Sequence, residues 1–111
     1  MKRFIAVVVS TLIMVFGLLT SPAFAADLAS GAQVFSTNCT ACHMEGGNLV
    51  NATKTLKQAD LEKYEMASLE AIKTQVLNGK MAMPAFKGRL TDEQIEDVAT
   101  YVLDQAGKGW S

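Results

Sequence analysis

Apolar and polar residues follow two different patterns along the chain. Residues 4–19 are almost all apolar, with few interruptions. After residue 25 the apolar residues recur three and four positions apart, which is the spacing of one face of an α-helix. No segment of this second part alternates convincingly as a half-buried strand would. The pattern therefore predicts a small all-α domain over residues 26–111, preceded by an apolar leader.

About four helices are expected in the domain, and the three longer ones each begin at a residue that can cap a helix N-terminus. The capping residues are Asp27, Ser68 and Thr91, the last with Gln94 at the spacing of a capping box. The second helix is short and covers residues 55–61. The expected apolar faces are, in order, Leu28, Ala32 and Phe35; Leu56 and Ala59; Leu69, Ile72, Val76 and Leu77; and Ile95, Val98, Ala99 and Val102. Glycines at 79 and 107 are expected to end the third and fourth helices, and residues 80–89 are expected to form a loop.

The leader has the three parts of a secretory signal peptide. Lys2-Arg3 is a basic start, the apolar run follows, and Ala23-Phe24-Ala25 has the small-x-small pattern of a cleavage site. The apolar run is shorter than the roughly 18 to 20 residues that span a bilayer, which argues against a membrane anchor. We expect a signal peptide over residues 1–25, cleavage before Ala26, and no stable membrane insertion afterwards. Export places the mature chain in an oxidising compartment.

The charge balance excludes one class of function. The chain carries a formal net charge of -1, and loss of the two leader cations, Lys2 and Arg3, makes it -3. Proteins that bind nucleic acid through its phosphates need an excess of positive charge. We therefore expect no nucleic-acid partner. A domain of this size buries only a modest core, so it gains stability from a bound group or a cross-link.

The clearest chemical signal is the run Cys39-Thr40-Ala41-Cys42-His43, which has the spacing of a c-type haem attachment site. Two thiols at this spacing reach the two vinyl groups of the porphyrin, and the histidine that follows offers a ring nitrogen to the iron. A dithiol redox centre is an alternative, but it normally lies beside a βαβ unit. A zinc site is another, but it would need carboxylates to complete four ligands.

His43 is the only histidine, so the second axial ligand of the iron cannot be another histidine of this chain. The candidate methionines beyond the leader are Met44, Met66, Met81 and Met83. We favour Met83, because Pro84 biases it towards an extended backbone in a loop long enough to reach the opposite haem face. Met81 could compete with it. Two protein ligands leave the iron no open position, which favours electron transfer over an enzyme such as a peroxidase.

The order of motifs resembles the cytochrome c6 family over nearly the whole mature chain. The motifs are Cys39 to His43, Lys54-Thr55-Leu56, Asn78-Gly79-Lys80, Ala82-Met83-Pro84-Ala85-Phe86, Gly88-Arg89-Leu90, Gln94 to Ala99, and Lys108-Gly109-Trp110. The resemblance implies a class I cytochrome c fold around one covalently bound haem c. It implies a soluble carrier in the thylakoid lumen that moves electrons from the cytochrome b6-f complex to photosystem I. A periplasmic respiratory carrier that donates to a terminal oxidase is the alternative.

The resemblance also assigns individual residues. It implies that Cys39 and Cys42 carry the haem and that His43 and Met83 ligate the iron. It places Gln75 beside the haem, where it would tune the reduction potential, and Arg89 near the exposed haem edge, where it would help docking on photosystem I. The chain departs from the family at Met81, where asparagine is more common.

Overall fold

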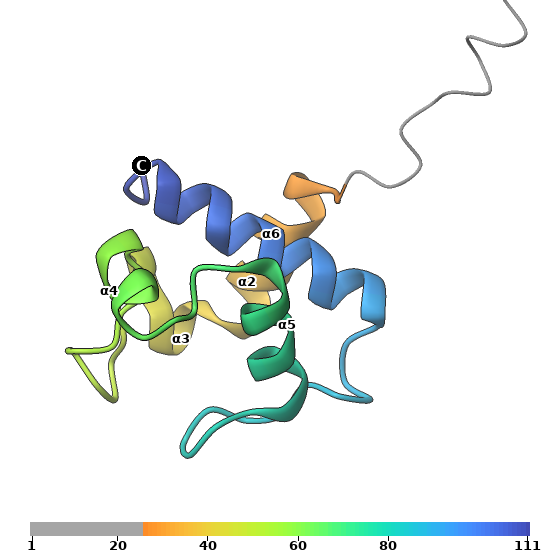
Figure 1. Cartoon of the computed structure of the whole chain (residues 1–111). Helices are drawn as coiled ribbons and strands as arrows, with labels where there is room; N and C mark the ends of the chain where they lie inside the picture. The colour runs from red at the N-terminus through yellow and green to blue at the C-terminus, as the bar shows by residue number, and fades with distance from the viewer. Residues whose placement is uncertain (1–25) are drawn as a thin grey trace, which may run out of the picture.

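The computed structural model describes residues 26–111, so the predicted signal peptide and its cleavage site at residues 1–25 lie outside the described residues. The helices are α2 (Leu28–Asn38), α3 (Thr40–His43), α4 (Gln58–Lys63), α5 (Leu69–Asn78) and α6 (Asp92–Gly107), with a 3-10 turn η1 (Met44–Gly46) after α3 (Figure 1). Residues 26–111 contain only two isolated β-bridges besides these helices. The all-α prediction is confirmed, with five α-helices where about four were expected.

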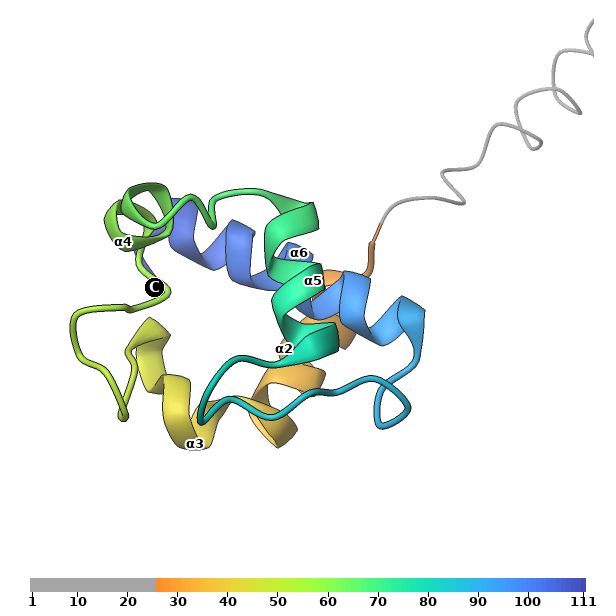
Figure 2. The same cartoon turned by 60° about the horizontal axis from the view of Figure 1, so that its bottom comes forward.

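Helices α2 and α6, which are the first and last of the described part, pack on one another (Figure 2). Gly31 of α2 allows the close approach, because a Cβ atom there would lie 2.8 Å from the Cβ of Tyr101 and would overlap the backbone carbonyl of Asp97. The Asp97 side chain is only 4% exposed. Its Oδ1 accepts a hydrogen bond from the Asp27 backbone N–H at 3.0 Å, which ties the start of α2 to α6.

The predicted helix caps are confirmed. The side chains of Asp27 and Ser68 accept hydrogen bonds from backbone N–H groups three residues later, at 3.1 and 3.2 Å. Thr91 forms the capping box with Gln94, in which each side chain bonds the backbone N–H of the other residue. These bonds satisfy N–H groups that the first turn of a helix leaves without a partner. Helix α6 ends at Gly107, as expected.

The core lies where α2 and α5 pack against α6. Its buried apolar side chains are Val34, Phe35, Leu61, Ile72, Val76, Phe86, Ile95, Val98, Ala99, Val102 and Ala106. The expected face of α6 is entirely buried, and so are the two central positions of the α5 face. The expected face of α2 is partly wrong, because Leu28 is 41% exposed. The buried face of α2 is set by Gly31, Val34 and Phe35 instead, since the glycine backbone is what contacts α6.

The short helix was predicted three residues too early. It begins at Gln58 rather than Thr55, and Ala59, which was expected to face the core, is exposed. The reason is a side-chain interaction: the backbone N–H and the hydroxyl of Thr55 both donate hydrogen bonds to the Asp60 carboxylate. This pairing holds Thr55 outside the helix, so that Leu61 becomes its buried residue.

No helix within residues 26–111 has both the length and the apolar character needed to cross a membrane.

Candidate functional site

The Cys-x-x-Cys-His run forms a helical turn of its own, α3, which the sequence pattern did not predict. Cys39 lies at the junction of α2 and α3. The N–H groups of Cys42 and His43 both donate to the Cys39 carbonyl, at 3.2 and 2.9 Å. Residues three and four positions apart on a helix lie on one side of it. The helical turn therefore presents both thiols and the imidazole on the same side.

The environment of the two thiols does not suit a dithiol redox centre. Cys39 is half-buried and Cys42 is exposed. Burial, with a smaller contribution from Cys42, raises the pKa of the Cys39 thiol to about 11. Reactive cysteines of redox centres have a lowered pKa that favours the thiolate. Within residues 26–111 there is also no group of three His, Cys, Asp or Glu side chains that could hold a zinc ion.

The imidazole of His43 is oriented by a backbone carbonyl. Its Nδ1 lies 2.9 Å from the carbonyl oxygen of Gly47, so Nδ1–H donates and Nε2 is left as the free lone pair. The chain reverses sharply between these two residues, because Glu45 and Gly46 both have positive φ, 53° and 78°. The reversal brings the Gly47 carbonyl back to the ring, and His43 is thereby prepared to bind a metal through Nε2.

Met83 and Met81 belong to one tight turn, but their side chains have different surroundings. The backbone groups of Lys80 and Met83 exchange two hydrogen bonds, at 3.0 and 2.9 Å, which leaves Met81 and Ala82 at the tip. The Met81 side chain is 96% exposed, whereas Met83 is half-buried and packs against the core. Met81 also has a positive φ of 53°, a conformation that asparagine adopts more readily than methionine does. The turn therefore favours Met83 over Met81 as a ligand.

Gln75 of α5 is hydrogen-bonded to the sulfur of Met83. Its Nε2 donates to Met83 Sδ at 3.5 Å. The turn is held against the end of α5 by Gly79, which has a φ of 69°. A Cβ atom at Gly79 would lie 2.6 Å from the Met83 carbonyl oxygen and 2.7 Å from the Ala85 nitrogen. Sequence reasoning placed Gln75 near the haem only by resemblance, and its bond to Met83 had no signal of its own.

Arg89 lies at the surface, near the end of the loop that carries Met83. Its guanidinium carbon is 5.0 Å from the centre of the Phe86 ring, and its backbone N–H donates to the Phe86 carbonyl at 2.9 Å. Phe86 is buried, while Arg89 is exposed. The structure therefore gives Arg89 a fixed backbone and a cation–π contact, with its charge on the outside.

The donor set fits a haem of the c type. The two thiols and the Nε2 of His43 come from α3 and the residue just before it, and the Met83 sulfur comes from the loop after α5. Among the described residues α3 and α5 make no contact with one another, and Figures 1 and 2 show them as separate segments. Ligands on two segments that are not packed together suit a flat group held between them.

Comparisons with known proteins give the family. A family model described as "Cytochrome C oxidase, cbb3-type, subunit III" matches residues 26–102. The chain is 61% identical over 110 residues to cytochrome c6 of Gloeothece citriformis, covering 99% of this chain and 100% of the relative. It is 64% identical over 110 residues to cytochrome c6 of Thermostichus vulcanus, covering 99% and 97%. The chain belongs to the cytochrome c6 family.

A solved structure agrees with this assignment. Cytochrome c6 from the diatom Phaeodactylum tricornutum matches with a TM-score of 0.74 and 46% identity, over 76% of this chain and 99% of that one. The predicted class I cytochrome c fold is confirmed. A member of the cytochrome c6 family carries one covalently bound c-type haem. It is an electron-transfer protein rather than an enzyme, with photosynthetic redox partners.

Proposed function

We propose that Cys39 and Cys42 would hold the haem through two thioether bonds and that His43 Nε2 and Met83 Sδ would ligate its iron. The observation that carries this assignment is the bond between His43 Nδ1 and the Gly47 carbonyl at 2.9 Å, because it leaves only Nε2 available to the iron. The hydrogen bond from the Gln75 amide supports Met83 as the second ligand, since it orients the Met83 sulfur.

The mechanism is the transfer of single electrons without any bond to a substrate. The bound haem supplies a one-electron iron couple. His43 and Met83, each held by a hydrogen bond, would serve as ligands in both oxidation states and so would limit rearrangement between them. Several apolar side chains pack partly buried against the hydrophobic core, among them Leu56, Met66, Leu69, Leu77 and Leu90.

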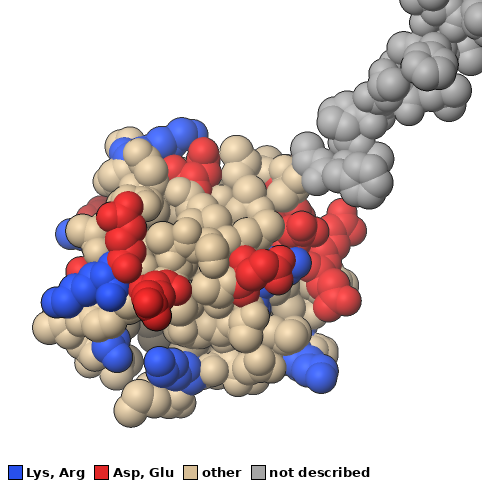
Figure 3. Space-filling model, viewed as in Figure 1, with Lys and Arg blue, Asp and Glu red and all other residues tan. Residues whose placement is uncertain are grey.

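We propose that the protein works in the thylakoid lumen, to which a signal peptide cleaved before Ala26 directs it. Its electron donor would be the cytochrome b6-f complex and its electron acceptor photosystem I. Family membership supports this route. Figure 3 shows acidic side chains on the side where α6 begins, further acidic side chains among basic ones on the left of this face, and basic side chains along its lower margin. Surface charges of this kind steer association with a partner and make the on-rate depend on salt. Arg89 is the cation that we assign to docking on photosystem I.

A respiratory role is the second candidate. The description of the matching family model names a subunit of a terminal oxidase. This description favours a periplasmic carrier that donates electrons to such an oxidase. The two candidates share the haem site and differ in the acceptor and in the compartment.

Flash-induced oxidation with purified photosystem I tests the route. We expect fast donation that slows as salt is raised, and a lower second-order rate constant for Arg89→Ala. Lys87→Ala is the matched control, because it removes a nearby exposed cation from the same loop. Absence of donation by the parent protein would favour the respiratory route. A colourless mature chain with both thiols open to alkylation would contradict the haem assignment itself.

A further inference from the structure

The end of α6 is built so that the chain turns back and places Trp110 against another part of the molecule. The backbone N–H of Trp110 donates to the Gln105 carbonyl at 2.8 Å, and the backbone N–H of Gly109 donates to the Ala106 carbonyl at 3.3 Å. Together with the positive φ of Gly109, 72°, these bonds form a Schellman motif, which needs a residue such as glycine at that point. The motif fixes the position of the residue that follows the glycine, which is Trp110.

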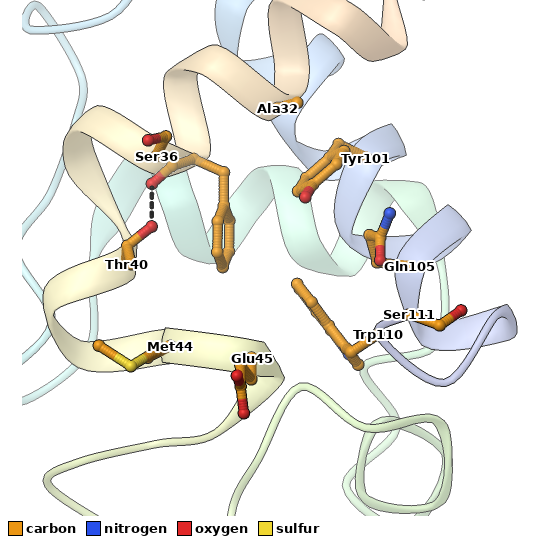
Figure 4. A pocket seen from close by; sticks show the side chains of 10 residues that line it. Ala32, Ser36, Thr40, Met44, Glu45, Tyr101, Gln105, Trp110 and Ser111 are labelled. Carbon is orange, nitrogen blue, oxygen red and sulfur yellow. Dashed lines mark hydrogen bonds between the residues drawn. The ribbon is translucent and has the colours of Figure 1, made fainter.

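The Trp110 indole contacts the 3-10 turn η1 directly. A Cβ atom at Gly46 would lie 2.5 Å from Cδ1 of the indole, so only a glycine leaves room for the ring. Figure 4 shows the Trp110 side chain between the end of α6 and η1, on the same side as Tyr101. The ring also packs on Phe35, with a distance of 5.3 Å between ring centres. The indole therefore closes over the backbone at Gly46.

The same indole is hydrogen-bonded to the segment that covers η1. Trp110 Nε1–H donates to the Leu56 carbonyl at 3.0 Å. The Leu56 N–H in turn donates to the Gly46 carbonyl at 2.7 Å. Trp110 thus holds both partners of the Leu56–Gly46 bond, one by packing and one by a hydrogen bond.

The contacts that Trp110 makes with this segment end at Gly46, one residue before the carbonyl that orients His43. Gly46 is followed by Gly47, whose carbonyl accepts from His43 Nδ1. The peptide plane between Gly46 and Gly47 is held at both ends, because the Gly46 carbonyl accepts from Leu56 and the Gly47 N–H donates to the Met44 carbonyl at 3.0 Å. The Gly47 carbonyl lies in the next peptide plane, joined to the first through the Gly47 Cα alone, and glycine is conformationally permissive there. Fixing Gly46 from the other side therefore limits how far the Gly47 carbonyl can move away from the imidazole.

We propose that Trp110 is a positioning residue for the His43 imidazole, acting through Gly46 and the Gly47 carbonyl; this inference rests on the proposed role of His43 as a haem ligand. A bond from Nδ1–H to a carbonyl raises the basicity of a metal-bound imidazole. A firmly held Gly47 carbonyl therefore stabilises the ferric state relative to the ferrous one. The C-terminal tryptophan would in this way set both the orientation and the electronic character of a ligand distant from it in the sequence.

The test compares the mature holoprotein with Trp110→Phe, which keeps an aromatic ring but removes the Nε1–H donor. Hydrogen exchange is followed by NMR in the reduced protein for the Leu56 amide and for the His43 Nδ1 proton. We expect both to exchange faster, on the order of five- to tenfold, which is the loss that one hydrogen bond accounts for. We also expect the midpoint potential to rise, because the imidazole becomes less basic.

Tyr101→Phe is the matched control. The Tyr101 ring belongs to the same aromatic cluster, and its centre lies 6.2 Å from that of the Trp110 ring. The substitution removes the Tyr101 hydroxyl, and no hydrogen bond to Gly46 or Leu56 is lost with it. We expect neither proton to exchange faster in this variant. The control separates the loss of the Leu56 bond from a general loosening of the cluster.

Two results would overturn the inference. In one, the Leu56 amide exchanges faster in Trp110→Phe while the His43 proton and the potential stay as in the parent, so that Trp110 only anchors the C-terminus. In the other, neither proton responds. Failure of the proposed function looks different, because the parent protein itself would then lack the strongly shifted imidazole signals of a histidine bound to iron.

Discussion

Gln75 Nε2 donates a hydrogen bond to Met83 Sδ at 3.5 Å, which joins the middle of α5 to the proposed sulfur ligand. The donor carries partial positive charge close to the metal. Positive charge at this place disfavours the ferric state more than the ferrous state, so the bond raises the reduction potential. Gln75 is thus the residue through which α5 acts on the site.

Replacement of this donor should lower the potential. In Gln75→Leu the sulfur keeps its position but loses the amide, so we expect a decrease corresponding to about 1 kcal/mol, or roughly 40 mV for a one-electron couple. Redox titration followed by the haem absorbance measures it. Thr74→Val, on the exposed side of the same helix, should leave the potential unchanged. A potential that stays constant in Gln75→Leu would contradict this role of the bond.

The two methionines of the turn should behave differently on substitution. Met83→Ala should open an axial position, lower the potential and allow small ligands such as carbon monoxide or imidazole to bind, because the thioether that favours reduced iron is lost. Met81→Ala is the matched control, since its side chain is 96% exposed. Absorption spectra with added ligand measure both. Ligand binding by the Met81 variant alone would reverse the assignment.

The crossing of α2 and α6 should tolerate no side chain at residue 31. Gly31→Ala places a methyl group 2.8 Å from Tyr101 Cβ and against the Asp97 carbonyl, so the helices must move apart. We expect a loss of about 1 to 3 kcal/mol in the free energy of unfolding, as for other overpacked sites. Gly107→Ala, with nothing near the added Cβ, should be neutral or slightly stabilising. Denaturant titration of the holoproteins measures both, and equal effects would argue against the close crossing.

The start of α4 should give a distinct response to acid. The hydroxyl and then the backbone N–H of Thr55 lower the pKa of the Asp60 carboxyl. A lowered pKa means that the bond contributes fully above the ordinary value for aspartate, about 3.9, and is lost as pH falls through the folded-state value. We expect the thermal midpoint of the parent to fall more steeply below about pH 4 than that of Asp60→Asn. Glu62→Gln on the same helix should follow the parent, and a parallel fall in Asp60→Asn would contradict the prediction.

Local chemistry explains what could be predicted from the sequence. The caps at Asp27, Ser68 and Thr91 depend only on residues a few positions away, and all three are present. The apolar face of α6 was also correct, because a long amphipathic helix has one possible buried side. The Cys-x-x-Cys-His run was recognisable for the same reason, since its chemistry is contained in five successive residues.

The features that sequence reasoning missed depend on specific side-chain and backbone contacts that hydrophobic periodicity does not encode. The start of α4 was misplaced because Thr55 pairs with Asp60 instead of entering the helix. Leu28 was assigned to the core because the close approach of Gly31 to α6 has no signature in the periodicity. The bond from Gln75 to Met83 likewise arises only when the loop folds back on α5.

The pairing of α2 with α6 has a consequence for the order in which the molecule is made. The Asp27 backbone N–H and the Asp97 carboxylate, which are joined by a hydrogen bond, belong to residues 70 positions apart. The last helix is translated after nearly everything else. The interior cannot close until that helix has arrived, and closing so long a segment is slow. Until then the two thiols of the proposed haem attachment site stand on a chain whose interior is still open.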